Sequence, residues 1–292
     1  GLMLQAAALG KQVYDITGRE IDIGWIGLVE FLPAAFLVLV TGMVADRFQR
    51  KKVAMIGMAG ELASALALMF YARTHPTAVA PIFFIAFLYG VSRAFIAPAA
   101  RSIWPMVAPL GGMPAVVALS SATWTGAAIL GPASSGLLYS VDPWVAYAVA
   151  SSLIALSMVV LTRVKTGQAA TEENRERPTL KHALEGLQFV RRTPILLAAI
   201  SLDLFAVLFG GAIALLPVIA EERLNVGDVA YGWLRAAVGI GAGSVAIFLA
   251  FRPARRRIGR LLFFVVGTFG IATIVLGLTR SYLVAFIAVI VA

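Results

Sequence analysis

The chain has 292 residues, of which 60% are hydrophobic and only 13% are charged, and its formal net charge is +9 at pH 7. A soluble globular protein carries about one quarter charged residues, so this composition indicates a polytopic membrane protein. The chain has no cysteine, which excludes disulfides, iron–sulfur clusters, thiolate zinc sites and cysteine nucleophiles.

Both ends of the chain fall within apolar runs, at Gly1 and at Ala292. We therefore expect a fragment, or a chain trimmed at both ends, with no signal peptide visible. The only two histidines, His75 and His182, fall in loops on opposite sides of the predicted membrane, so we expect no metal site.

Apolar runs long enough to cross a hydrocarbon core of about 30 Å follow one another along the chain. We expect the last part of a first span at residues 1–13 and a tenth span that begins near Tyr282. The spans between them are predicted at residues 23–45, 53–72, 78–97, 113–139, 144–162, 194–219, 230–251 and 261–279. The span at 78–97 is expected to end at Pro98, because proline interrupts a helix.

Residues 163–193 form the single long polar stretch. Apolar residues recur there at helical spacing, which predicts an amphipathic helix on the inner membrane surface, at Leu180, Leu184, Leu187 and Val190. The sequence therefore predicts an N-terminal helical half at 1–162, a linker at 163–193 and an incomplete C-terminal half at 194–292.

The positive charges support this layout, because Lys and Arg near span ends stay on the cytoplasmic side. Most of the 24 Lys and Arg residues fall in the predicted inner segments, which are residues 47–52, Arg101, 163–192 and 252–260. The cations placed outside are Lys11, Arg19, Arg73, Arg223 and Arg280. The net charge is thus explained by topology rather than by a nucleic-acid partner.

An internal repeat links the two halves. Gly27 and Glu30 precede the first basic turn as Gly232 and Arg235 precede the second, at one offset of 205 residues (27 to 232, 30 to 235). Two equivalent halves of the same orientation are the parallel repeat of secondary transporters, whose substrate site lies between the repeats.

The turn at residues 42–52 reads Gly-Met-Val-Ala-Asp-Arg-Phe-Gln-Arg-Lys-Lys. A plain positive-inside loop explains its cations, but not a glycine one turn before an Asp-Arg pair and a basic triplet after it. The combination resembles the signature loop between helices 2 and 3 of the major facilitator superfamily of secondary transporters, with Gln49 in place of the family's usual glycine. The resemblance implies a conformational gate formed by Gly42, Asp46, Arg47, Arg50 and Lys51.

By this resemblance we expect an all-α major facilitator fold of two six-helix halves, truncated here at both ends to about helices 1–10 of 12. The stretches 95–105, 12–18 and 185–217 are similar to the branch that contains enterobactin (siderophore) exporters and macrolide efflux pumps. The likeness covers nearly the whole chain and does not specify a substrate.

Small residues and a proline recur in the span at 113–139, at Gly126, Gly131, Pro132 and Gly136. Small residues let helices approach closely, so tight packing explains the individual glycines. The Gly-Pro followed by a glycine resembles the helix-5 motif of facilitator antiporters, which favours export.

Ionisable groups inside spans cost about 2.5–3.5 kcal/mol each at a helix centre and are functional candidates by default. The candidates for the cavity and for proton coupling are Asp203, Arg93, Glu30, Glu61 and Arg235. Arg93 and Asp203 lead, since their spans line the central cavity in facilitator transporters. For Arg93 and Glu61 a purely structural ion pair is an equal alternative, and Asp203 has the alternative of pairing with Arg93 or capping a kinked helix.

The function predicted from the sequence is a secondary active exporter that exchanges protons for a siderophore or a hydrophobic, drug-like molecule. No Gly-x-x-x-x-Gly-Lys-Ser/Thr loop is present, so we expect a proton gradient rather than ATP as the energy source, and no cofactor. Solute uptake and a non-transporting scaffold are the alternatives; a lipid-modifying enzyme lacks catalytic groups. We expect a monomer in the bacterial plasma (inner) membrane, with the lipid bilayer and a small-molecule substrate as its partners.

Overall fold

The computed structural model describes residues 1–107, 112–164, 189–194, 196–197, 200–201, 204, 213–252 and 258–292, and every regular element among them is a helix. The elements of the first part are α1 (Leu2–Thr17), α2 (Glu20–Arg47), α3 (Arg50–Ala72), α4 (Ala80–Val107), α5 (Met113–Tyr139) and α6 (Pro143–Arg163). The later elements are α9 (Leu216–Val218), the π-helical turn η2 (Ile219–Arg223), α10 (Asp228–Phe251), α11 (Ile258–Leu278) and α12 (Tyr282–Val291). The expected all-α fold is confirmed.

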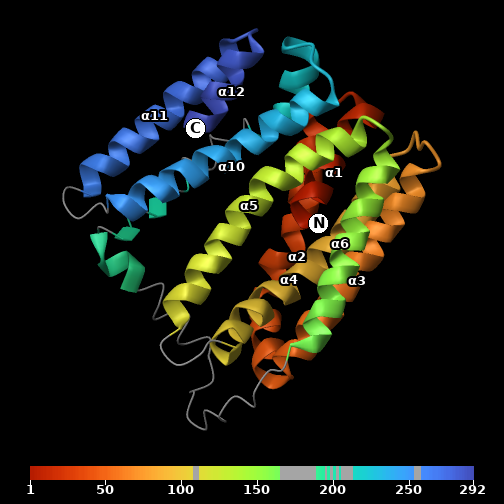
Figure 1. The fold of residues 1–292 in the computed structure, drawn as a ribbon, viewed down its shortest axis with the longest axis vertical. Helices are drawn as coiled ribbons and strands as arrows, with labels where there is room; N and C mark the ends of the chain where they lie inside the picture. The colour runs from red at the N-terminus through yellow and green to blue at the C-terminus, as the bar shows by residue number, and fades with distance from the viewer. Residues whose placement is uncertain are drawn as a thin grey trace.

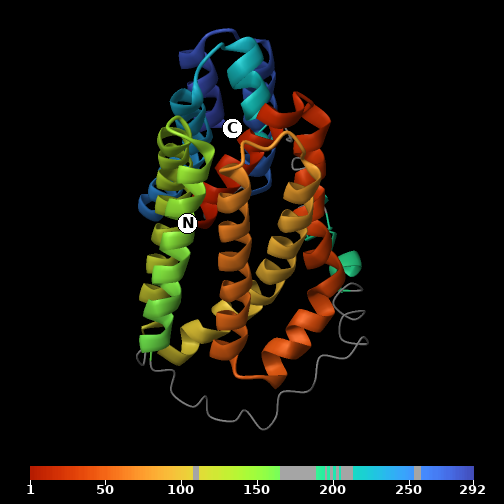
Figure 2. The ribbon, with the colours of Figure 1, turned by 90° about the vertical axis from the view of Figure 1, so that its right-hand side faces the viewer.

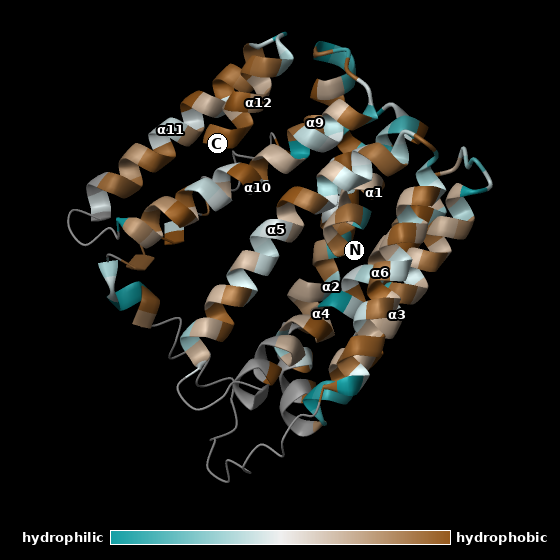
Figure 3. Cartoon of the chain, in the orientation of Figure 1, coloured by the Kyte–Doolittle hydropathy of each residue, from teal (hydrophilic) through white to brown (hydrophobic). Residues whose placement is uncertain are grey.

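Six of these helices, α3 to α6, α10 and α11, contain segments long and apolar enough to cross a membrane. Apolar runs of this length form helices in lipid, because each backbone N–H and C=O must then find its hydrogen-bond partner within the segment. Figure 3 shows the apolar residues along the helices and the hydrophilic ones gathered at the turns that join them. The basic turn between α2 and α3 marks the inner side of the molecule.

Two predicted boundaries are corrected. Helix α4 runs on to Val107 and contains Pro98, the residue that was expected to end it. Proline is tolerated inside membrane helices, because neighbouring helices and local adjustments satisfy the backbone group that it frees. The predicted basic turn at 42–52 is also shorter than expected, since α2 ends at Arg47 and α3 begins at Arg50.

Two groups of helices each have a hydrophobic core of their own. Helices α1 to α6, here called the N-terminal half, surround a cluster that includes Leu68, Ile82 and Tyr147. Helices α9 to α12 with η2, here called the C-terminal half, surround a second cluster that includes Leu216 and Leu234. The two views show four helices of the first group, α2, α3, α4 and α6, running along the long axis, with the second group beside their upper end (Figures 1 and 2).

The internal repeat reappears in the element boundaries. Adding 205 to the bounds of α2 gives 225–252, close to the observed α10 at Asp228–Phe251. The same addition to the bounds of α3 gives 255–277, close to α11 at Ile258–Leu278. Most of the predicted linker at 163–193 and half of the predicted span at 194–219 lie outside the described residues, so the three-part division stays a prediction.

The most extensive contact between the halves joins α5 to α10. Gly136 of α5 meets Gly232 of α10, and a Cβ placed on Gly136 would lie 2.8 Å from the Gly232 Cα. A Cβ on Gly131 would lie 2.6 Å from the Met3 side chain of α1. Both glycines therefore act through close helix packing, as predicted, whereas nothing lies within 4 Å of a Cβ built on Gly126. In Figure 1, α5 and α10 meet at their outer ends and separate towards their inner ends.

Gly136→Val should destabilise the protein, because its added side chain would meet the backbone of α10 rather than a movable side chain. Forced overpacking of this kind costs about 1–3 kcal/mol. The matched control is Gly126→Val on the same helix, where the space is open. Thermal unfolding in detergent should give a lower melting temperature for Gly136→Val than for Gly126→Val; equal melting temperatures would contradict the close contact.

Candidate functional site

Helix α1 passes between the two halves, and all of its residues from Ala7 to Tyr14 are buried. It contacts α2, α5 and α6 of the N-terminal half and α9 of the C-terminal half. Its polar side chains must therefore find partners inside the protein. Gln12 does so, because Tyr147 of α6 donates a hydrogen bond of 2.7 Å to the Gln12 Oε1.

Two of the predicted cations, one from each half, lie within electrostatic range of Glu30, although neither forms an ion pair of 4 Å or less with it among the described residues. The Glu30 carboxylate of α2 interacts electrostatically with Arg93 of α4 and with Arg235 of α10. Arg235 donates from Nη1 to the Tyr231 hydroxyl at 3.0 Å, and Tyr231 donates in turn to the Ala7 carbonyl of α1 at 3.2 Å. Glu30, Arg93 and Arg235 thus form a mixed-charge group that includes residues of both halves.

Arg93 connects this group to a further carboxylate. Its side chain makes a hydrogen bond with Tyr89, one turn earlier on α4, and interacts electrostatically with Glu61 of α3. Arg93 is exposed, whereas Glu30 and Arg235 are half-buried. A cation between two carboxylates in a low-dielectric region is attracted to both, so a change in the charge of either carboxylate changes the field at Arg93.

Glu61 is 3% exposed, and its Oε1 has no hydrogen-bond partner among the described residues. No ion pair of 4 Å or less involves Glu61 in the described part of the chain, where Arg93 is the charged side chain that acts on it electrostatically. A buried carboxylate without a full set of partners is destabilising, so Glu61 is retained here at a cost to stability.

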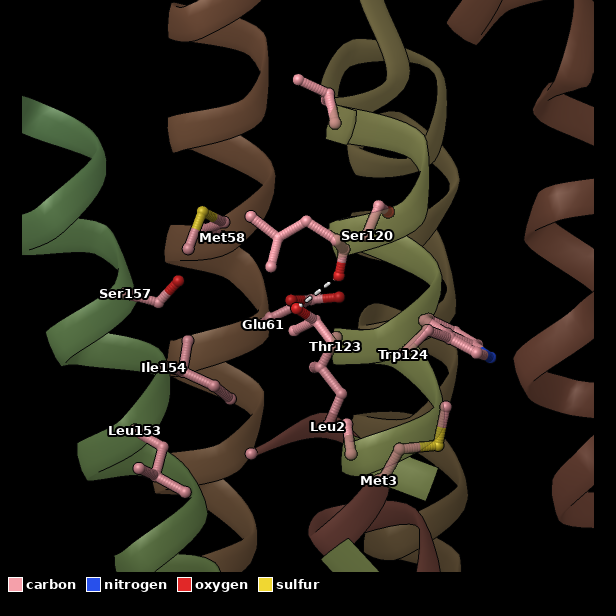
Figure 4. Close-up of a pocket in the computed structure, with 14 residues that line it drawn as sticks. Leu2, Met3, Met58, Glu61, Ser120, Thr123, Trp124, Leu153, Ile154 and Ser157 are labelled. Carbon is pink, nitrogen blue, oxygen red and sulfur yellow. Dashed lines mark hydrogen bonds between the residues drawn. The ribbon is translucent and has the colours of Figure 1, made fainter. Parts of the chain in front are cut away.

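Glu61 lines a cavity of about 540 Å³ between α3, α5, α6 and the start of α1. Figure 4 shows its carboxylate facing Thr123 and Ser120 of α5, with Ser157 of α6 on the opposite wall. The lining is mostly apolar and includes Trp124. Gly1, Leu2 and Met3 also form part of the wall.

A second polar group lies at the outer end and was missed from the sequence. Lys11 of α1 was predicted to lie on the outer side and does lie at the outer end of its helix, but its side chain is only 6% exposed. Its Nζ contacts Asp15 of α1 at 2.5 Å, Asp228 of α10 at 3.2 Å, and Glu221 of η2. One signal for this group was present, since residues 12–18 were noted for their family likeness without a role for Tyr14 or Asp15.

Two tyrosines complete the outer group. The Tyr139 hydroxyl of α5 donates to Asp15 at 2.6 Å, and the Tyr14 hydroxyl of α1 donates to Glu222 of η2 at 2.6 Å. The Lys11 ammonium also lies 5.7 Å from the centroid of the Tyr139 ring. Each of the carboxylates Asp15, Glu221, Glu222 and Asp228 thus has a recorded donor.

The predicted gate is described only in part. Gly42, Asp46 and Arg47 lie in the last turns of α2, but their side-chain positions are outside the described residues. Lys51 has a defined role within the N-terminal half, because its Nζ donates to the carbonyls of Thr162 at 3.0 Å and Val164 at 2.7 Å. It therefore caps the carbonyl end of α6, as cations at helix C-termini do.

The remaining predicted residue, Asp203, lies outside the described residues, so its role stays a prediction. Among the described residues there is no group of three or more His, Cys, Asp or Glu side chains that could hold a metal ion. The chemistry that the described polar groups provide is reversible ionic pairing and proton exchange on carboxylates inside a bundle of apolar helices.

Comparison with known protein families gives one match over nearly the whole chain. The family described as Major Facilitator Superfamily matches residues 3–292. The MFS-type transporter YfiS of Bacillus subtilis (strain 168) is 25% identical over 279 residues, which are 91% of this chain and 64% of that protein. Macrolide efflux protein A of Streptococcus pyogenes is 25% identical over 217 residues, which are 72% of this chain and 52% of that protein. The chain thus spans between about half and two thirds of the length of these relatives.

Solved structures agree on the fold. A bacterial homologue of the human lysosomal transporter Spinster, in an inward-facing and unoccupied conformation, aligns over 99% of this chain and 70% of that chain, with a TM-score of 0.66 and 16% identity. The D-xylose–proton symporter aligns over 99% of this chain and 76% of that chain, with a TM-score of 0.61 and 14% identity. At these identities the likeness establishes the helical architecture alone.

Lys51→Met should lower the stability of the N-terminal half, because two carbonyls at the end of α6 lose their donor. A cation at a helix C-terminus contributes about 0.3–1 kcal/mol. The control is Lys52→Met, which removes the same charge from an exposed neighbour. Chemical unfolding of the purified variants in detergent should show the larger loss for Lys51→Met; an equal loss would mean that the charge alone matters.

Proposed function

We propose that this chain, which belongs to the major facilitator superfamily, forms most of a secondary active transporter that exports a siderophore or a hydrophobic, drug-like molecule in exchange for protons. The observation that carries the proposal is the group formed by Glu30, Arg93 and Arg235, whose members come from both halves. In transporters built from repeats the substrate site lies where the repeats face each other.

The energetic argument starts from the position of these charges. Glu30 and Arg93 belong to α2 and α4 of one half and Arg235 belongs to α10 of the other, so relative movement of the halves changes their separation. Charged groups inside a membrane protein are costly and persist where they bind substrates or ions. A group whose partners change as the halves move is suited to bind a ligand in one arrangement and release it in the other.

Export is favoured over uptake by two observations. One is the 25% identity to macrolide efflux protein A over 72% of this chain. The other is the Gly131-Pro132 pair followed by Gly136, which resembles the helix-5 motif of facilitator antiporters. The siderophore as a substrate rests on the sequence likeness to the enterobactin exporter branch.

The remaining parts of the proposal follow from the family. The transporter acts as a monomer in the bacterial inner membrane, with a proton gradient as its energy source and no cofactor. Gly42, Asp46, Arg47 and Arg50 clamp the inner ends of the two halves while the cavity faces outwards. Asp203, in the span at 194–219, carries the coupled proton.

The test is an export assay in cells that lack other pumps, with siderophores and macrolides compared as substrates of the intact protein. Arg235→Gln should reduce export of the active substrate roughly tenfold or more, because the Glu30 carboxylate loses a charge partner. Arg280→Gln is the control, since it removes the same charge from an exposed position at the outer end of α11. Equal export by the two variants would exclude the central group as the substrate site.

Asp203→Asn should uncouple export from proton entry, because an amide cannot load and release a proton. Substrate efflux and proton flux are measured together in vesicles at several pH values. We expect the proton flux that accompanies efflux to disappear in this variant while the protein remains inserted. Coupled efflux that matches the parent across pH would remove Asp203 from the coupling mechanism.

A further inference from the structure

The outer polar group joins the two halves through a single cation. Lys11 and Asp15 come from α1 of the N-terminal half, whereas Glu221 and Asp228 come from η2 and α10 of the C-terminal half. Lys11 is only 6% exposed, so little water could reach its ammonium group if the carboxylates moved away. A buried charge that loses its partner is strongly destabilising, which makes separation of the outer ends unfavourable as long as Lys11 remains buried.

The helix packing continues inwards from this group for only part of the interface. Gly136 faces Gly232 near the outer end, and a Cβ on Gly243 would lie 2.9 Å from Thr125 further along the two helices. Beyond these positions the apolar side chain of Phe248 on α10 is exposed. The two helices diverge over the same part of their length (Figure 1). The outer ends are thus closed while the inner ends stand apart.

We infer that Lys11, Asp15, Glu221 and Asp228 form a latch that holds the outer ends of the two halves together, and that the protein must break this latch to open outwards. Sealing the latch takes up a proton from the outer side. The inference rests on the proposed function only for its place in a transport cycle, because the latch itself is a property of the closed conformation.

The proton follows from the charges in the latch. Asp15, Glu221 and Asp228 face one lysine, and the neighbouring Tyr14, Tyr139 and Glu222 supply no further cation. The Asp15 and Glu221 carboxyl groups are within hydrogen-bond reach of each other, which is favourable when one of them is protonated. Burial raises the pKa of Glu221, which lies past the end of its span, and the hydrogen bond from Lys11 opposes that rise.

The sign of the pH effect is set by this shift. The closed state holds Glu221 at a pKa above that of a free glutamate, so the closed state binds the proton more tightly than the open state. Acid on the outer side therefore favours the latch. The stabilisation of the closed state by this proton is complete below the ordinary glutamate pKa, and it is lost as the outer pH rises through the raised pKa of Glu221. An antiporter driven by inward proton flow must close its outer end with a proton bound, and the protonated latch would provide that step.

Because the chain has no cysteine, a single introduced thiol can be labelled without removing others first. Ala7→Cys in the intact protein places a thiol one turn below Lys11 on the same face of α1, at a fully buried position beside α10. A membrane-impermeant maleimide added from outside reports opening of the outer end. Ala86→Cys is the control, because Ala86 is buried inside the core of the N-terminal half and should stay protected unless the protein unfolds.

In the parent background, labelling of the Ala7→Cys thiol should slow as the outer pH falls from about 8 towards the ordinary glutamate pKa of 4.5, after correction for the reagent's own pH dependence. Lys11→Met should speed labelling roughly tenfold or more, since three carboxylates lose their shared cation. Glu221→Gln mimics the protonated latch, so its labelling should be slow and independent of pH.

If the Ala7→Cys thiol is labelled at the parent rate in Lys11→Met while the Ala86→Cys thiol stays protected, the latch hypothesis is wrong. If Lys11→Met also exposes the Ala86→Cys thiol, the nearly isosteric Glu221→Gln decides, and a pH dependence equal to the parent's in that variant would overturn the proton-linked closure. The readout does not require transport, so a failed export assay and a failed latch are separate results.

Discussion

Burial of the Lys11 ammonium sets a constraint on the arrangement of the two halves. An ammonium group held away from water requires carboxylates around it, and the partners found here come from α1, η2 and α10. Those elements must therefore meet at one point. The glycine contact between α5 and α10 satisfies the same requirement, because Gly136 and Gly232 let the two backbones approach beside Asp228, the first residue of α10. Charge pairing and close packing thus act at the same end of the interface, and neither extends to the inner ends.

Helix α1 connects the outer latch with the central charges. Lys11 lies in the latch, while the carbonyl of Ala7, one turn below on the same helix, accepts a hydrogen bond from Tyr231, which in turn accepts one from Arg235. A displacement of α10 at the latch therefore also moves Tyr231 and Arg235 against α1. Because Arg235 is one of the cations that act on Glu30, a short chain of contacts links the outer latch to the central group. This is a physical route for coupling the closure of one end to events in the middle of the membrane.

The helical architecture and the repeat could be predicted from the sequence, because apolar length and the offset between residues 27–30 and 232–235 are local properties that the bilayer constrains strongly. The end of α4 was wrong at Pro98, since helix propensity in water underestimates what neighbouring helices tolerate. The outer position of Lys11 was predicted but its burial and its partners were not, because a hydropathy pattern shows where a charge lies along the chain but not which other helices bring carboxylates to it. Glu30, Arg93 and Arg235 were each predicted as candidates, but the electrostatic link from Glu30 to the two arginines depends on how α2, α4 and α10 are arranged in space, which the sequence does not show. The sequence also could not show that Gly136 packs tightly while the space beside Gly126 is open, because that difference depends on where α10 lies.

The charges at the two ends of the molecule are under different constraints. Lys and Arg near span ends fix the orientation of a membrane protein, whereas Asp and Glu contribute little to that choice. The inner turn with Arg50, Lys51 and Lys52 therefore already serves insertion, and Lys51 adds a structural role as the cap of α6. Carboxylates at the outer end, such as Asp15 and Glu221, are free of this requirement. An outer end that collects carboxylates around one buried lysine can thus acquire proton sensitivity without disturbing topology, while an inner gate must work with the cations that topology demands.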